Sequence, residues 1–159
     1  MKRLLATVAL LAPYVNSYRR YVPDFAAPIN LEWGRDNRTT GLRIPVSGPA
    51  ARRVENRIAG ADANPYLVIA ASLAAGLAGM DEHLTPTAPL LISDNAATLG
   101  YGLPRSFLPA HERMAASASA RRLLGDAFVT GFCAAKGVEY DSYLYEVSAW
   151  ERRFLLPQV

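Results

Sequence analysis

The segment Asn37-Arg38-Thr39-Thr40-Gly41-Leu42-Arg43-Ile44-Pro45 decides the fold, because in it a strand-like run follows a turn and both carry arginine. Upstream, residues 29–33 (Ile-Asn-Leu-Glu-Trp) alternate apolar and polar side chains, which is the pattern of a half-buried strand. Residues 34–37 (Gly-Arg-Asp-Asn) lie between the two runs and are typical of a turn. We therefore expect two strands that pair as a hairpin and carry Arg38 and Arg43.

A second segment, Arg53-Val54-Glu55-Asn56-Arg57, has a charged residue at every other position. If it is extended, the side chains of Arg53, Glu55 and Arg57 point to one face. A carboxylate between two guanidiniums can hold a divalent cation while the guanidiniums bind phosphate or carboxylate oxygens. The same pattern is also typical of an ion-pair ladder on a solvated surface, so the motif alone leaves both interpretations open.

A helix is predicted directly after these segments. Asn64 can cap free backbone amides, and Pro65 suits the first position of a helix. The run from Tyr66 to Met80 is apolar almost all round, so we expect this helix, over residues 64–80, to be buried.

The remaining helices are expected towards the carboxyl end. Residues 81–105 contain several Pro, Gly and Asn and should form a long surface excursion. Helices then follow over 106–118 and 120–155, the latter either in two pieces or as one helix strained at Gly137, where Gly costs about 1 kcal/mol relative to Ala. We predict an α+β fold in which antiparallel strands at 28–58 are packed by the helices 64–80, 106–118 and 120–155.

The charge of the chain is unevenly distributed. The 159 residues include 17 Lys and Arg against 14 Asp and Glu, and only Lys2 and Lys136 are lysine. The single cysteine excludes a disulfide framework, and the separation of His83 from His111 argues against a structural zinc site. Eight arginines lie between residues 19 and 57: Arg19, Arg20, Arg35, Arg38, Arg43, Arg52, Arg53 and Arg57. This clustering points to an anionic ligand, although scattered arginine can also be ordinary solvated surface.

The amino terminus allows two interpretations. Cationic residues precede an apolar run, Leu4–Ala12, which has the length of the apolar part of a secretory signal and is far shorter than the ~20 residues that span a bilayer. The apolar residues also recur at helical spacing, at Leu4, Val8, Leu11 and Val15. We therefore expect residues 1–12 to form a packed helix.

Four motifs occur in a specific order: Asn16-Ser17-Tyr18-Arg19-Arg20, then Asn37-Arg38-Thr39 with a second arginine at 43, then Arg53-Val54-Glu55-Asn56-Arg57, then Ala63-Asn64-Pro65-Tyr66-Leu67. Together they resemble the C-terminal part of the catalytic domain of the glutamine synthetase family, from about residue 12 to the carboxyl end. The residues at 27–34, 54–57, 60–65 and 150–156 resemble the γ-glutamylpolyamine (γ-glutamylputrescine) synthetase branch in particular.

The resemblance implies an ATP-dependent ligase that phosphorylates the side-chain carboxylate of glutamate, after which an amine displaces phosphate. It implies Mg²⁺ or Mn²⁺ as cofactor, and ATP, glutamate and either ammonia or a polyamine such as putrescine as substrates. It also implies a cytoplasmic homo-oligomer, a dodecamer-like ring in the intact family, that binds neither nucleic acid nor membrane. The site residues implied by motif position are Arg20, Arg38 and Arg57 for glutamate, Arg38 for the transferring phosphoryl group, Arg43 and Arg53 for ATP, and Glu55 for the metal.

Two departures from the family pattern bear on activity. Many members carry a Lys near ATP where this sequence has Ala50. The family's N-terminal β-rich domain and the first half of its catalytic domain are also absent, and with them the other metal-binding acids, the metal-binding His and the Gly-rich glutamate loop. We therefore expect Met1 to be an internal or truncated start and residues 1–159 to be a C-terminal portion that is inactive alone.

Other classes of function stay open. One is a non-catalytic assembly or binding module that associates with intact ligase subunits, and another is a secreted or membrane-tethered basic protein. Nucleic-acid binding ranks lowest, because the chain lacks a recognised nucleic-acid module.

Overall fold

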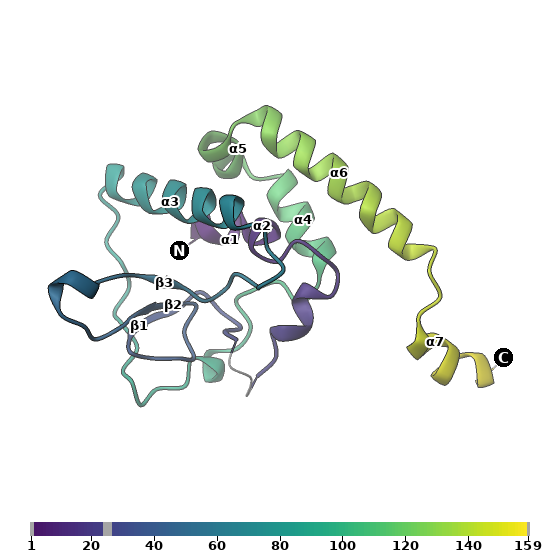
Figure 1. Cartoon of the computed structure of the whole chain (residues 1–159), viewed down its shortest axis with the longest axis horizontal. Coiled ribbons are helices and arrows are strands. Elements are labelled where there is room, and N and C mark those ends of the chain that lie inside the picture. The colour runs from purple at the N-terminus through teal and green to yellow at the C-terminus, as the bar shows by residue number, and fades with distance from the viewer. Residues whose placement is uncertain (1, 24–26, 159) are drawn as a thin grey trace.

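The computed structural model describes residues 2–23 and 27–158. A small sheet lies below a layer of helices, and the carboxyl-terminal helices extend to one side (Figure 1). The strands are β1 (Trp33–Arg35), β2 (Leu42–Ile44) and β3 (Glu55–Asn56). The helices are α1 (Lys2–Leu5), α2 (Val8–Leu11), α3 (Pro65–Asp81), α4 (Phe107–Ala115), α5 (Ala118–Leu124), α6 (Asp126–Leu144) and α7 (Ala149–Phe154). The predicted α+β class is confirmed.

The sheet has the order β1-β2-β3, and its two pairings differ in direction. Strands β2 and β3 are antiparallel, as predicted, with Arg43 opposite Glu55. The predicted hairpin is wrong, because β1 and β2 run parallel, with Gly34 opposite Arg43. Strands of three residues span only about 10 Å, so the short connection 36–41 is long enough to return the chain to the same end.

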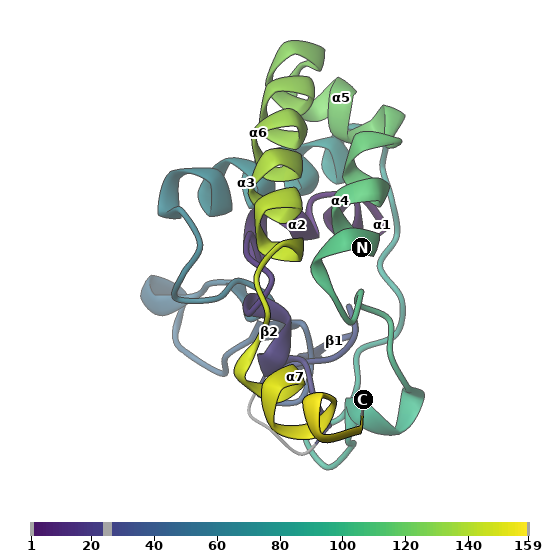
Figure 2. The same cartoon turned by 90° about the vertical axis from the view of Figure 1, so that its right-hand side faces the viewer.

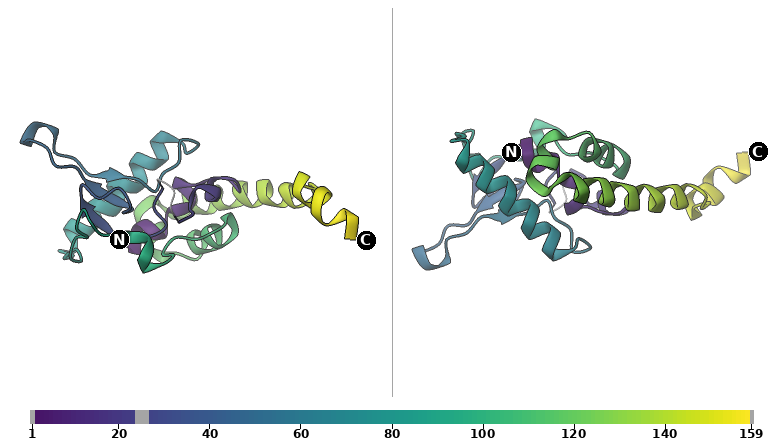
Figure 3. Two further views of the ribbon diagram at one scale, coloured as in Figure 1. Left: turned by 90° about the horizontal axis from the view of Figure 1, so that it is seen from below. Right: turned by 90° about the horizontal axis from the view of Figure 1, so that it is seen from above.

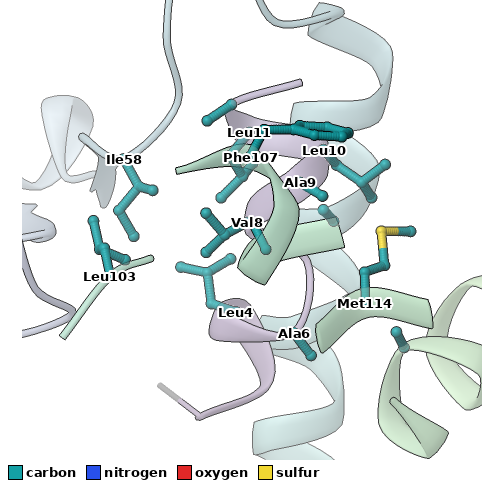
Figure 4. Packing of buried hydrophobic residues seen from close by; sticks show 14 of the residues in the cluster. Leu4, Ala6, Val8, Ala9, Leu10, Leu11, Ile58, Leu103, Phe107 and Met114 are labelled. Carbon is teal, nitrogen blue, oxygen red and sulfur yellow. The ribbon is translucent and has the colours of Figure 1, made fainter. Parts of the chain in front are cut away.

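The core is centred on α2. The side chains of Val8, Leu10 and Leu11 are at most 1% exposed and pack against Phe107 and Met114 of α4 (Figure 4). This burial favours the packed-helix interpretation of the amino terminus. The predicted single helix is nevertheless two short ones, α1 and α2, which are separated around the buried Thr7, whose Oγ1 donates to the carbonyl of Leu4 at 3.0 Å.

Helix α3 begins where the sequence predicts. The side-chain oxygen of Asn64 accepts hydrogen bonds from the backbone amides of Tyr66 and Leu67, at 2.9 and 3.4 Å, and Pro65 is the first helical residue. The predicted burial of this helix is wrong, since Ala71 is the one fully buried residue of α3, all of which the structure describes. Only one side of α3 packs on the chain, against α1, α2 and α5.

The solvent side of α3 carries an exposed apolar stripe. Its members are 57–81% exposed and recur at helical spacing, at Tyr66, Ile69, Leu73, Leu77 and Met80. Beside it, a groove of about 1070 Å³ lies between the sheet and the end of the helix, lined by Trp33, Ile44 and Met80 among others. We call this stripe and groove the α3 face.

The carboxyl-terminal helical region is divided differently from the prediction. The predicted helix 106–118 corresponds to α4, which ends at Ala115. The predicted region 120–155 is helical in three parts, α5, α6 and α7, which are separated at Gly125 and at residues 145–148, and it does not break at Gly137. Gly125 has a φ of 88°, a left-handed conformation that glycine adopts without penalty, whereas Gly137 lies inside the continuous helix α6.

Helices α6 and α7 lead away from the body of the molecule (Figures 2 and 3). Helix α6 still packs on α4 and α5, whereas the large apolar side chains of α7 are exposed, Trp150 at 60% and Phe154 at 46%. Within the described residues, no helix combines the length and the apolar character needed to cross a membrane.

Candidate functional site: the arginine cluster

The loop between β1 and β2 is built around a buried asparagine. Asn37 is 1% exposed, and its side-chain amide donates to the carbonyls of Leu91 and Asp94, at 2.6 and 2.9 Å. Its side-chain oxygen accepts from the backbone amide and the hydroxyl of Thr39, at 2.8 and 2.7 Å. These bonds fasten the excursion 81–105 to the loop and hold the adjacent Arg38 at the surface.

Gly34 allows the same excursion to come close to the sheet. It forms an isolated parallel bridge with Leu90, and a Cβ atom at Gly34 would lie 2.7 Å from the Leu90 carbonyl oxygen. Any larger residue would therefore push this segment away from β1.

Arg20 is tied to the segment that follows β3. Its Nη1 donates to the carbonyl of Ile58 at 2.5 Å, and its Nη2 donates to the carbonyl of Arg57 at 3.4 Å. The hydroxyl of Tyr21 donates to the same Ile58 carbonyl at 2.8 Å, and burial raises the pKa of Tyr21 to about 12. Arg20 thus lies beside Arg57, although the two are far apart in sequence.

A second tie fixes the same pair of segments. The hydroxyl of Ser17 donates to a carboxylate oxygen of Asp62 at 2.5 Å and accepts from the backbone amide of Tyr14 at 3.1 Å. The other carboxylate oxygen of Asp62 lies so close to Gly60 that a Cβ there would be 2.2 Å away. The segment 14–20 and the segment 57–62 therefore form one unit around Arg20.

Two arginines and two carboxylates form a chain of ion pairs at the sheet. Arg43 lies on β2 and Glu55 on β3, while Asp36 directly follows β1 and Arg53 lies shortly before β3. Arg43 pairs with Glu55 through Nη1 and Oε2, at 2.8 Å, and with Asp36 through Nη2 and Oδ1. Arg53 pairs with the other carboxylate oxygen of Glu55, Oε1, at 2.9 Å. The side chains of Arg43 and Glu55 are only 16% and 26% exposed. We call these four residues, Asp36, Arg43, Arg53 and Glu55, the ion-pair cluster.

Arg57 lies within the electrostatic influence of three other predicted arginines. Burial lowers the pKa of Arg57, and the positive charges of Arg43, Arg38 and Arg20 lower it further. Arg57 also donates from Nη2 to the carbonyl of Arg38 at 2.8 Å. Hydrogen bonds from Arg43 and then Arg53 lower the pKa of Glu55.

The structure therefore brings the six predicted residues into one continuous region. Arg43 and Arg53 each contact Glu55 directly, while Arg20, Arg57 and Arg38 are joined through backbone carbonyls. Two acids in this region, Asp36 and Asp62, were missed by the sequence analysis. No spacing rule links Asp36 to Arg43, because their contact depends on the parallel pairing of β1 and β2.

The side chains of this region supply only part of the ligand set that a divalent cation needs. Among the described residues, no group of three or more His, Cys, Asp or Glu side chains could hold a metal ion. Glu55 is the predicted metal ligand, and both of its oxygens already accept from arginine. Because Mg²⁺ is commonly bound by one or two carboxylates together with substrate phosphates, these residues fit a cation that is held partly by a polyphosphate.

Comparisons with known proteins identify relatives of this chain. The model of the glutamine synthetase catalytic domain matches residues 1–155. Type-1 glutamine synthetase 2 of Dictyostelium discoideum is 40% identical over 144 residues, which cover 88% of this chain and 27% of that protein. The γ-glutamylputrescine synthetase PuuA of Escherichia coli K12 is 54% identical over 79 residues, covering 50% of this chain and 17% of PuuA.

A solved structure shows the same fold. The ADP complex of GmaS superimposes with a TM-score of 0.82 and 32% identity, covering 98% of this chain and 37% of GmaS. The chain thus spans about a third of the length of the relatives that it matches.

Proposed function

This chain belongs to the glutamine synthetase catalytic-domain family, and from that premise we propose that its arginine cluster is part of the site of an ATP-dependent glutamate–amine ligase. The observation that carries the proposal is that contacts join the arginines in one region: Arg57 is linked to Arg20 and Arg38 through backbone carbonyls, and Arg43 and Arg53 share Glu55. Positive charge of this density suits a reaction in which a phosphoryl group passes from ATP to the side-chain carboxylate of glutamate. An amine then displaces phosphate from the resulting γ-glutamyl phosphate.

The nucleotide side of the site is proposed to lie at β2 and β3. Arg43 and Arg53 would bind phosphate oxygens of ATP, since each guanidinium offers several donors in a planar fork. Glu55 would be a ligand of Mg²⁺ or Mn²⁺, which supplies charge neutralisation on the phosphates. The contacts that join these three side chains support a shared role.

The glutamate side is proposed to lie at Arg20 and Arg57. Arg20 would bind a carboxylate of glutamate, and the ties of Ser17 to Asp62 and of Tyr21 to Ile58 would keep it beside Arg57. Arg38, which is exposed and whose carbonyl accepts a hydrogen bond from Arg57, would be the catalytic residue that steadies the transferring phosphoryl group.

We propose that the 159-residue chain alone does not turn over. Phosphoryl transfer from ATP needs metal ions that bridge the phosphates, and this region offers Glu55 as its one proposed metal ligand. The purified chain, given millimolar ATP, magnesium, glutamate and either ammonia or putrescine, should release no phosphate and form no amide. Robust turnover under these conditions would overturn the claim that the chain holds an incomplete site.

The proposal also covers the amine substrate, the oligomeric state and the cellular location of the ligase. The 54% identity with PuuA over half of the chain favours a polyamine such as putrescine over ammonia. A homo-oligomer in the cytoplasm is proposed on family grounds alone. Labelled putrescine should be incorporated into amide only when this chain is combined with the remaining parts of a ligase site.

A second candidate function, an assembly or binding module, is favoured by the α3 face. Apolar side chains such as Ile69, Leu73 and Leu77 lie exposed side by side, and patches of this kind commonly mark protein interfaces. In this alternative the chain would bind an intact ligase subunit without contributing to catalysis. Sedimentation of the chain with an intact glutamine synthetase should reveal a complex at micromolar concentration, and separate boundaries would exclude this alternative.

A further inference from the structure

The ion-pair cluster already engages both of its arginines. Both terminal nitrogens of Arg43 are engaged, Nη1 by Glu55 and Nη2 by Asp36. Arg53 gives its Nη2 and its Nε to Glu55, and its Nη1 to the carbonyl of Ala51. Two positive and two negative side chains therefore neutralise one another at the place where ATP phosphates are proposed to bind.

We propose that Asp36 and Glu55 act as internal counter-anions, which occupy the guanidiniums of Arg43 and Arg53 until a polyphosphate displaces them. The inference rests on the proposed ATP site and deepens it, because it makes phosphate binding an exchange of one anion for another. It also assigns a role to Asp36, which the motifs of the sequence do not indicate.

The two carboxylates are placed to release the arginines separately. If Glu55 turns its oxygens to a divalent cation, Arg53 and Nη1 of Arg43 become available to phosphate oxygens. Nη2 of Arg43 stays bound to Asp36 until a phosphate oxygen takes its place, so Arg43 keeps its position while Nη1 gains a ligand. The site thus favours a polyphosphate that arrives together with a cation over the same polyphosphate alone.

The backbone at Asp36 supports a specific role for this residue. Asp36 adopts a left-handed φ of 52°, which is uncommon for a residue other than glycine, and its backbone amide donates to the carbonyl of Ile44 at 3.0 Å. This conformation directs the carboxylate at Arg43. Because asparagine tolerates left-handed φ at least as well, Asp36→Asn removes the charge without adding strain.

The experiment uses the full chain and inorganic tripolyphosphate, titrated calorimetrically in EDTA and again in excess magnesium. In EDTA, Glu55→Gln should bind tripolyphosphate about fivefold more tightly than the wild type, and Asp36→Asn about threefold. The reason is that the loss of one competing ion pair changes the dissociation constant by a factor of about two to five. In magnesium, the wild type and Asp36→Asn should gain affinity, whereas Glu55→Gln should gain much less.

A matched control separates the replacement of a carboxylate by phosphate on the arginines from the general effect of net charge on anion binding. Glu32→Gln removes the same charge just before β1, and Glu32 makes no recorded ion pair with any described residue. Its effect in EDTA should stay below about twofold. Circular dichroism should show that all three variants are folded.

The outcomes distinguish the inference from the function on which it rests. If tripolyphosphate binds the wild type in magnesium, but Glu55→Gln and Asp36→Asn match Glu32→Gln in EDTA, the counter-anion role is overturned and the ATP site stands. If no form binds tripolyphosphate under either condition, the proposed ATP site in this chain is overturned, and the inference falls with it.

Discussion

Helices α2 and α3 are both apolar in sequence, yet they lie in opposite environments. Every residue of α2 is at most 1% exposed, whereas the outer stripe of α3 is more than half exposed. Helix α2 is covered on several sides, by α3, α4 and the residues around Ile58, while α3 packs on the chain with one side only (Figures 1 and 4). An apolar sequence pattern alone therefore does not predict whether the chain itself buries a helix.

The largest expected effect tests this comparison with one substitution made in both helices. Leu11→Ala should lower the free energy of unfolding by about 2–5 kcal/mol, because it leaves a cavity in the core. Leu77→Ala, at a side chain that is 57% exposed, should change it by less than about 0.5 kcal/mol. Urea denaturation of the purified chains measures both values. Equal losses would show that α3 is as well covered as α2.

The next effect extends the comparison to a buried polar side chain. Asn37→Ala should lower the free energy of unfolding by about 1–3 kcal/mol, since it leaves the carbonyls of Leu91 and Asp94 without their donor. Asn16→Ala is the control, because Asn16 is exposed and its side chain makes no capping hydrogen bond. Chemical denaturation should separate the two variants, and a stability for Asn37→Ala equal to that of the control would contradict the proposed fastening of the loop.

A smaller effect is expected on the α3 face, and on association more than on stability. Leu73→Ser should weaken any self-association, or binding of an intact ligase subunit, by about tenfold, because one apolar anchor leaves the interface. Its free energy of unfolding should stay within about 0.5 kcal/mol of the wild type. Sedimentation velocity at several concentrations measures the association. An unchanged association would show that the α3 face is not the contact surface.

The smallest effect concerns Glu55 and pH. Its pairing with Arg43 and Arg53 lowers its pKa in the folded chain, so the stability that it contributes is present above the ordinary glutamate pKa of about 4.3. That contribution is lost as the pH falls through the lowered pKa. The difference in stability between the wild type and Glu55→Gln should therefore be constant near pH 7 and begin to shrink as the pH falls below the ordinary glutamate pKa of about 4.3. A difference that keeps its full pH 7 value well below that pKa would show that it does not arise from the carboxylate charge.

Local signals predicted part of this fold correctly. The pair Asn64-Pro65 fixed the start of α3, because capping depends only on adjacent residues. The break at Gly125 in place of Gly137 was not predictable from composition, since either glycine can adopt a left-handed φ and packing on α4 and α5 selects one of them. The parallel pairing of β1 and β2 was missed, because turn residues between two short strands predict a hairpin, and no sequence pattern shows that the connection 36–41 returns the chain to the same end of the sheet.

The candidate site was likewise predicted only in part from the sequence. The six charged residues were found from motif order, and the structure places them in one region, while their roles stay predictions. The contact of Asp36 with Arg43 was missed because a hairpin would have paired the strands differently. Sequence patterns therefore identified the residues of the cluster, and the tertiary structure was needed to identify their partners.

The most direct test of the central claim is an NMR titration that follows the guanidinium signals of the chain. With magnesium and ATP, the signals of Arg43 and Arg53 should shift, and with glutamate, those of Arg20 and Arg57. Arg38, which is proposed to steady the transferring phosphoryl group, should respond to both ligands. Arg121 and Arg122, on α5, should not shift and serve as internal references. If neither ligand moves the cluster, or if the references move equally, the arginine cluster is not part of an ATP and glutamate site.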